Sequence, residues 1–284
     1  MKLIIHRGSH EIGGTCIELI AENSRILIDA GLPLSEEQEK IPATLKHSLK
    51  QTAAPLKGIL ISHPHLDHYG LLAQIDHDVP VFAGKAASVL MKTTFELTDS
   101  EHEWIEPVIF RSGKEFEIGD FTIKPYLVDH SGFDSYAFLI KSWGKSIFYS
   151  GDFRSHGRKG RLFEGFLKKP PQVDILLLEG TMVGTEREAG VLTEEQLEER
   201  FVNSITATDG AVFVTLSSQN IDRIVTLFRA CKKSSRSLII DPYTAEILKR
   251  LKDVQTELGI KCSLPQASWK GIHVCYPQHL CRWM

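Results

Sequence analysis

Apolar residues in the first half of the chain fall in short runs separated by turns rich in glycine and polar residues. Such runs are typical of β-strands. The runs 16–20 and 24–29 flank Glu22-Asn23, a pattern that predicts a hairpin. Residues 115–149 predict successive antiparallel strands, and Lys85–Thr94 predicts a helix. The full set of expected strands is 1–5, 16–20, 24–29, 58–61, 79–82, 115–118, 121–128, 135–141 and 145–149.

The second half of the chain has a different pattern. Val173–Leu178 is continuously apolar, which predicts a strand in a sheet buried on both faces. Thr193 and Gln196 are spaced as a capping box at the start of a helix. Helices are then expected over 193–207, 221–231 and 244–258, alternating with strands over 211–216 and 237–240. This alternation predicts a parallel α/β unit, and we place the domain boundary so that the domains are 1–180 and 181–284.

The composition excludes several classes of protein. The chain has 284 residues, 42% apolar and 24% charged, with a net charge of −3, as in an ordinary soluble globular protein. The chain has no positive net charge that would indicate nucleic-acid binding, so any contact with nucleic acid must come from a local basic patch. No apolar run approaches a membrane span, and we expect no membrane partner. Five scattered cysteines and no secretory signal favour reduced thiols and a cytoplasmic location.

The segment Ser62–His68 concentrates the candidate chemistry. It holds three histidines and one aspartate and directly follows the apolar run Gly58–Ile61. Imidazole and carboxylate groups are preferred ligands of Zn²⁺, and a loop fixed by a sheet holds its side chains in place. Asp29, His130 and Asp152 also follow predicted strands, so that all these side chains can meet at one rim of a sheet.

The pattern His-x-His-x-Asp-His, followed by His130 and Asp152, resembles the metallo-β-lactamase superfamily over residues 1–180. The resemblance implies a mixed α/β (α+β) fold, an αββα sandwich. It implies a metallo-hydrolase that binds one or two Zn²⁺ ions, with Mn²⁺ also compatible. Water coordinated to such a metal has a pKa of about 7, so a nucleophile is available at neutral pH. Taken alone, His130 would be read as a surface histidine and Asp152 as a turn residue.

The resemblance also implies roles for individual residues. One metal would be held by His63, His65 and His130, and a second by Asp67 and His68. Asp152 would bridge the two, and catalysis would involve Asp67, Asp152 and His130. Asp29 would orient the loop Ser62–His68, which carries the ligands, from outside the coordination sphere. The alternative that Asp29 is an ordinary turn residue stays open.

Two features favour a nucleic-acid substrate, and the family resemblance alone implies RNA rather than DNA. A basic stretch that includes Arg154, Arg158 and Lys159 follows Asp152, and cations beside metals suit a polyanion; a solvated basic loop is the alternative. The second half resembles a partial β-CASP domain, found in nucleic-acid-processing enzymes, and Glu179 matches its first acidic motif. Ser217 and Ser218 precede a helix and are suited either to phosphate contact or to an ordinary N-cap.

The resemblance is incomplete. The later histidine motifs of β-CASP proteins are missing before Met284, so we expect a truncated chain that holds its second metal weakly. Two rival functions therefore stay open: a small-molecule hydrolase of thioesters, lactones or lactams, and a vestigial nucleic-acid-binding protein without activity. RNA or DNA, endo- or exonucleolytic cleavage and a homo-oligomer are also left open. The tail residues Cys262, His273, Cys275, His279 and Cys281 match no zinc motif and are expected to be ordinary side chains.

Overall fold

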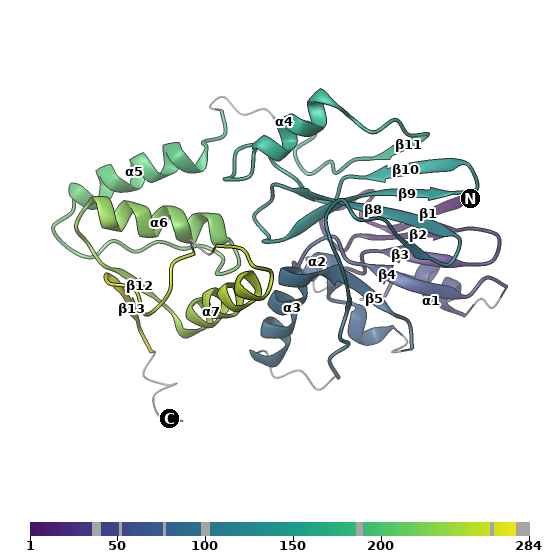
Figure 1. Cartoon of the computed structure of the whole chain (residues 1–284), viewed down its shortest axis with the longest axis horizontal. Helices are drawn as coiled ribbons and strands as arrows, with labels where there is room; N and C mark the ends of the chain where they lie inside the picture. Colours follow the sequence, from purple (N-terminus) through teal and green to yellow (C-terminus); the bar gives the residue numbers. More distant parts are fainter. Residues whose placement is uncertain are drawn as a thin grey trace. The chain divides into compact units, whose positions relative to one another are not determined.

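The computed structural model of the chain describes residues 1–35, 41–50, 53–75, 78–97, 103–185, 190–261 and 264–276. These fall into two units (Figure 1): Met1–Ser155 with Arg161–Thr185, and His156–Gly160 with Glu186–Met284. The division at residue 180 concerns independently folding domains and stays a prediction. Among the described helices, none is both long enough and apolar enough to cross a bilayer.

The first unit contains a six-stranded sheet in which the strands follow chain order. The first three strands are antiparallel and the remaining pairs are parallel. The hairpin predicted across Glu22-Asn23 is confirmed, and the N–H of Ala21 donates to the carbonyl of Ser24. The strands are β1 (Lys2–Arg7), β2 (Cys16–Ile20), β3 (Arg25–Ile28), β4 (Leu56–Leu60), β5 (Val81–Gly84) and β6 (Val108–Phe110).

A five-stranded sheet forms the second layer, in the order β11-β10-β9-β8-β7. The predicted antiparallel series is confirmed, and β11 is added parallel to β10 at the edge. The prediction that Val173–Leu178 is buried on both faces is wrong: Leu176 is 58% and Leu178 60% exposed. Leu177 packs against the core between the sheets, whereas the opposite face of this edge strand is largely exposed, and a run of apolar residues does not reveal which face is covered. The strands are β7 (Phe116–Ile118), β8 (Phe121–Val128), β9 (Ser135–Ser142), β10 (Lys145–Tyr149) and β11 (Ile175–Leu177).

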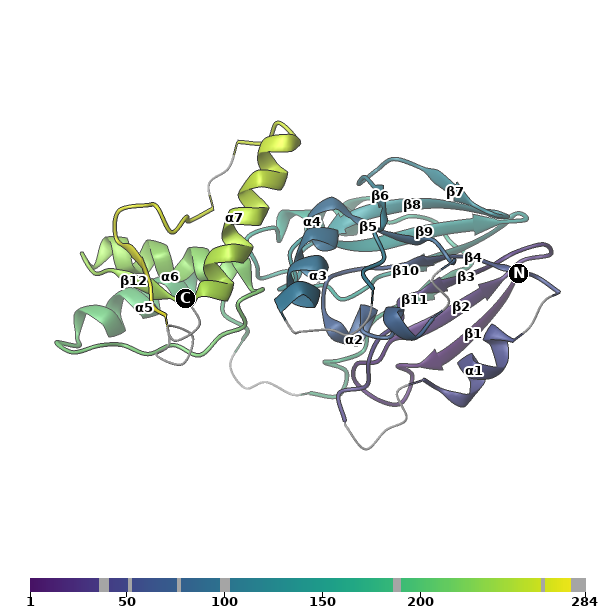
Figure 2. The ribbon, with the colours of Figure 1, turned by 90° about the horizontal axis from the view of Figure 1, so that it is seen from below.

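The alternation of side chains along β3 shows how the layers pack. Ile26 and Ile28 face the second sheet and share a core with Phe121 and Phe138. Leu27 faces the other way and packs in a core that includes residues of three helices: α1 (Ala43–Leu49), α2 (Leu66–Tyr69) and α3 (Lys85–Leu97). On the far side of the second sheet lies α4 (Arg161–Lys168). The expected αββα sandwich is therefore present, as Figures 1 and 2 show.

In its described residues, the second unit has three helices of 13 to 16 residues and a two-stranded parallel sheet of β12 (Leu238–Ile240) and β13 (Ile272–Val274). The capping box is confirmed: Thr193 and Gln196 bond reciprocally at the start of α5. The predicted strand 211–216 is wrong, because none of these residues joins a ladder within the described chain, and Phe213 is 94% exposed. A strand needs a hydrogen-bonded neighbour as well as β-forming side chains. The helices are α5 (Glu194–Thr206), α6 (Ile221–Lys233) and α7 (Pro242–Glu257).

Candidate metal centre

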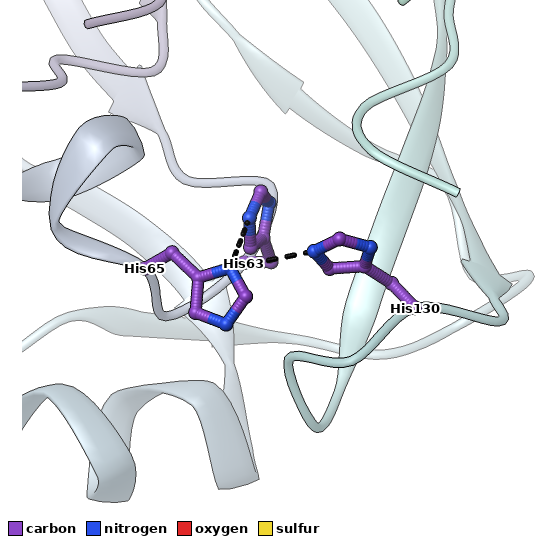
Figure 3. A group of neighbouring side chains, drawn as sticks. All are labelled: His63, His65 and His130. Carbon is purple, nitrogen blue, oxygen red and sulfur yellow. Dashed lines mark hydrogen bonds between the residues drawn. The ribbon is translucent and has the colours of Figure 1, made fainter. Parts of the chain in front are cut away.

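Three imidazoles from two sheets meet at one point (Figure 3). His63 and His65 lie in the loop after β4 of the first sheet, and His130 lies just after β8 of the second. The Nδ1 atom of His65 is 3.1 Å from Nε2 of His63 and 3.3 Å from Nε2 of His130. Zn–N bonds of about 2.0–2.1 Å in a tetrahedron place neighbouring nitrogens roughly 3.3–3.4 Å apart. The spacing of these nitrogens therefore fits three ligands of one ion.

A second group of metal-capable atoms shares His63 and adds His68 and Asp152. Asp152 follows β10 and directs its carboxylate at the histidines. Its Oδ2 atom lies 3.6 Å from Nε2 of His68 and 3.9 Å from Nε2 of both His63 and His130. One carboxylate oxygen thus faces both groups, a position suited to bridging two ions.

Burial keeps most of these imidazoles neutral, the form that binds a metal. Burial, reinforced by the neighbouring histidines, lowers the pKa of His63 well below its ordinary value. Burial likewise lowers the pKa of His65, and it lowers that of His130 to about 3. All three therefore offer unprotonated nitrogens near neutral pH, and this donor set fits a divalent transition metal.

His68 differs because carboxylates lie on both sides of its ring. Burial disfavours the imidazolium, but Asp29 and Asp152 outweigh burial and raise the pKa of His68 to about 10. Burial also opposes the ionised form of Asp152, yet its bond to His68 and the nearby histidines lower the pKa of this carboxyl. The group that contains His68 must therefore release a proton when a metal binds.

Asp29 accepts hydrogen bonds from every side of its buried carboxylate. The N–H of Ser62 donates to Oδ1, and the hydroxyls of Ser62 and Tyr149 donate to Oδ2, each at 2.7 Å. Nδ1 of His68 is 2.8 Å from the same Oδ2. Since the Ser62 hydroxyl donates to Asp29, its oxygen can accept from Nδ1 of His63, 3.0 Å away, which leaves Nε2 of His63 unprotonated. The position supports the orienting role expected of Asp29.

Sequence analysis missed Ser62 and Tyr149 as members of this network. Ser62 directly precedes His63, and Tyr149 ends the strand that leads to Asp152. The available signal in the sequence was that Ser62 and Tyr149 lie close to candidate ligand residues. The bond between Tyr149 and Asp29 joins residues 120 positions apart, and no local pattern specifies such a partner.

Asp67 and Glu179 lie close to the centre. Asp67 belongs to neither three-residue group, but its Oδ2 is 3.7 Å from Nε2 of His68. The backbone around Asp67 is held tightly, because Thr15 N–H donates to its carbonyl and a Cβ on Gly31 would lie 1.7 Å from that oxygen. Glu179 accepts from the N–H of Phe153, the residue after Asp152. This contact supports the loop that carries Asp152.

The residues predicted to contact substrate have internal partners. Arg154 forms an ion pair of 3.2 Å with buried Asp129. In the second unit, Arg158 donates to Thr226 at 2.7 Å and to Glu198 at 3.3 Å. Lys159 is half-buried in the same unit. Substrate contact by these three side chains stays a prediction.

The loop before α6 is built largely as a cap. Asn220 accepts from the N–H of Arg223 at the helix start. Ser217 is exposed, and the hydroxyl of Ser218 accepts from Thr244 at 2.8 Å. Phosphate contact by Ser217 and Ser218 stays a prediction. In the tail, Cys275 is an exposed free thiol, whereas Cys262, His279 and Cys281 lie outside the described residues.

Comparisons with known proteins agree with the layered fold. The chain is 27% identical to ribonuclease J of Sinorhizobium meliloti over 212 residues, 72% of the chain and 36% of that relative. It is 28% identical to the probable RNase MJ4 of Methanocaldococcus jannaschii over 204 residues, 64% of the chain and 45% of that relative. The chain thus spans less than half of the length of each of these curated relatives.

A solved structure and a family model extend the comparison. A protein of unknown function from Enterococcus faecalis V583 matches with a TM-score of 0.75 at 20% identity, over 94% of this chain and 70% of that one, and shares its fold. The model of the beta-lactamase superfamily domain matches residues 24–208, more than half of the chain. With its sandwich of two sheets and its histidine-rich centre, the chain belongs to the beta-lactamase superfamily.

Proposed function

We propose that this protein is a metal-dependent phosphodiesterase that acts on RNA. The observation that carries the proposal is the convergence of two three-residue groups, both containing His63, at the rim of a superfamily sandwich. The similarity to proteins named ribonuclease J and probable RNase supports RNA as substrate. Zinc is favoured by the mixture of imidazole and carboxylate donors, and Mn²⁺ is compatible with it.

In this proposal the residues hold two ions. His63, His65 and His130 would hold the first, and His68 with Asp67 would hold the second, with Asp152 between them. When bound, the ions supply Lewis acidity and lower the pKa of water, so that hydrolysis needs no strong side-chain base. The ionised Asp152 can help to orient a water molecule beside the ions. Asp29 keeps the ring of His68 aligned throughout.

A positive side chain near the centre, that of Arg154, suits a polyanionic substrate. Arg154 follows Asp152 by two positions, and its guanidinium is anchored by Asp129, which fixes its direction. An arginine so oriented is suited to contact phosphate oxygens and to stabilise the charge that develops during cleavage. Lys168 and Lys169 are exposed at the end of α4 in the same unit. Their contribution would be general neutralisation of phosphate charge, which depends on salt concentration.

The test is cleavage of a 5′-labelled single-stranded RNA by the full chain, with Zn²⁺ or Mn²⁺ and with a chelator. We expect metal-dependent cleavage that His65→Ala reduces by at least about 10²-fold. His47→Ala, at an exposed position of α1, is the matched control and should cleave at the wild-type rate. Turnover of a thioester without turnover of RNA would favour a small-molecule hydrolase. Retention of RNA on a filter without cleavage would favour a binding protein.

A further inference from the structure

Asp134 connects the loop that carries His130 to the start of α3. Its Oδ2 accepts from the backbone N–H groups of Ala86 and Ala87, at 2.9 and 3.0 Å. Its Oδ1 accepts from the hydroxyl of Tyr136 at 2.6 Å. A carboxylate at a helix N-terminus is stabilised by the helix dipole, and bonds to an ionised acceptor are strong. These contacts hold one end of the loop to a rigid element.

The backbone is arranged to allow this connection. Asp134 has φ of +65°, a left-handed conformation that costs free energy for a residue with a Cβ, least for Asp and Asn. Gly84, the last residue of β5, lies against it, and a Cβ there would come within 2.3 Å of Oδ2 of Asp134 and 2.6 Å of the Tyr136 ring. Only glycine allows the approach without a shift. The contact is therefore specific to this geometry.

The other end of the same loop lies against the histidines. A Cβ on Gly132 would be 3.2 Å from Cδ2 of His63 and 3.3 Å from the ring of His65. The Ser135 hydroxyl donates to the Gly132 carbonyl at 2.7 Å, and the N–H of Tyr136 donates to the carbonyl of Ser62 at 2.9 Å. The loop from His130 to Tyr136 thus connects the imidazole cluster to the start of α3.

We infer that Asp134 is a positioning residue for His130, which acts by fixing the loop between β8 and β9 to the start of α3. The inference rests on the proposed function in that it takes His130 as a metal ligand. The hydrogen bonds described for Asp134 go to the start of α3 and to Tyr136, and none of them goes to the three imidazoles. Groups that orient ligands from outside the coordination sphere typically alter metal affinity by about 10–100-fold. We expect loss of Asp134 to act selectively on the group that contains His130.

Cobalt binding tests this inference without any use of RNA. The metal-free full chain is titrated with Co²⁺, and the visible absorption of the bound ion reports its coordination geometry. His130→Ala identifies the binding event that requires this histidine. Asp134→Ala should weaken that event by about 10–100-fold and change its spectrum. The cobalt-binding event that remains in the His130→Ala variant does not need this histidine. It should therefore keep its wild-type affinity in the Asp134→Ala variant.

Two further variants separate positioning from general loss of structure. Asp134→Asn keeps an oxygen for the helix N–H groups and tolerates positive φ, so cobalt affinity should return to within a few-fold of wild type. Tyr136→Phe removes one hydroxyl and should give a smaller loss in the same direction as Asp134→Ala. Asp174→Ala is the matched control, because this exposed carboxylate also accepts a backbone N–H, from Ser146, and should bind cobalt normally.

The outcomes are distinct. Equal cobalt affinity and spectra in Asp134→Ala and wild type would overturn the inference and leave the proposed function intact. Equal weakening of both binding events would also overturn it, because the effect would then be general. A wild-type chain that binds no cobalt would overturn both. Cobalt binding without RNA cleavage in the wild type would overturn the proposed function, while the selective loss in Asp134→Ala would still support positioning.

Discussion

Nδ1 of His68 lies 2.8 Å from Oδ2 of Asp29, and both side chains are almost wholly buried. The same oxygen accepts from the hydroxyls of Ser62 and Tyr149, so it fixes a ligand ring and the base of the ligand loop together. An imidazole bonded to a carboxylate is oriented and made more basic, which strengthens its bond to a metal.

Asp29→Asn should weaken metal binding by about 10–100-fold while the fold is kept. The amide has nearly the same shape but no charge, so it supports His68 less well, and it must also accept the bonds that Ser62 and Tyr149 donate. Equilibrium dialysis with Zn²⁺ measures the change. Asp120→Asn, which alters a surface carboxylate that accepts from Asn23, is the control. Unchanged zinc affinity in Asp29→Asn would show that Asp29 is an ordinary structural residue.

Substitution of His63 and substitution of His130 should differ in the amount of bound metal that they remove. His63 belongs to both groups of metal-capable residues, whereas His130 belongs to one. His63→Ala should therefore remove the first ion and also weaken binding of the second, whereas His130→Ala should leave the second ion bound, about one equivalent of metal. Metal content of protein purified without chelator gives the answer. Equal metal content in the two variants would contradict a shared His63.

Gly31 and Gly165 give opposite predictions for the same substitution. A Cβ on Gly31 would lie 1.7 Å from the carbonyl oxygen of Asp67, so Gly31→Ala must displace the turn that carries a candidate ligand. Gly165 lies inside α4 with nothing within 4 Å of its Cβ position, and alanine favours helix by roughly 0.5–1 kcal/mol. Urea unfolding should show a loss for Gly31→Ala and a small gain for Gly165→Ala. The steric argument fails if both variants unfold at the wild-type midpoint.

Glu18 should give the first unit an acid-sensitive component of stability. Its buried carboxylate is 2.6 Å from the Arg25 guanidinium and 3.0 Å from His6. Burial alone would raise the pKa of Glu18, but the bonds to His6, Ser48 and Arg25 outweigh burial and lower it. A carboxyl pKa below its unfolded value contributes stability above that unfolded value, and the contribution disappears as pH falls through the lowered pKa.

Glu18→Gln should accordingly cost about 3–5 kcal/mol of unfolding free energy near neutral pH, because Arg25 is left buried without its charge partner. The difference from wild type should shrink in acid, where Glu18 of the wild type is itself protonated. Urea unfolding followed by circular dichroism at several pH values measures this. A difference that stays constant as pH falls would contradict the ionised state of Glu18.

The ligand cluster could be predicted because local sequence specifies most of it. His63, His65 and His68 are close in the chain, and a buried strand ends just before them. His130 and Asp152 also follow strands, and strand ends of packed sheets converge. The assignment of these residues as ligands stays a prediction, although the structure brings their donor atoms together.

The supporting contacts could not be predicted, because they depend on partners distant in the chain. In the sequence, Asp134 has the character of a turn residue. Its contacts become evident only in the structure, where Gly84 and the start of α3 lie beside it. Arg158 reads as a free cation, yet it bonds to Thr226 and Glu198. The run 211–216 has the composition of a strand, but composition does not supply a neighbouring strand. Composition and periodicity describe a segment, whereas these features are properties of pairs.

His63 and His65 come from the first sheet, while His130 and Asp152 come from the second. An ion bound at this rim would fasten the two layers of the sandwich to each other. Free metal at 100 times its dissociation constant would then add about 2.7 kcal/mol to the unfolding free energy. The lifetime of the folded protein would follow the supply of metal in its surroundings, and molecules that lack the ion would be the first to unfold and be degraded.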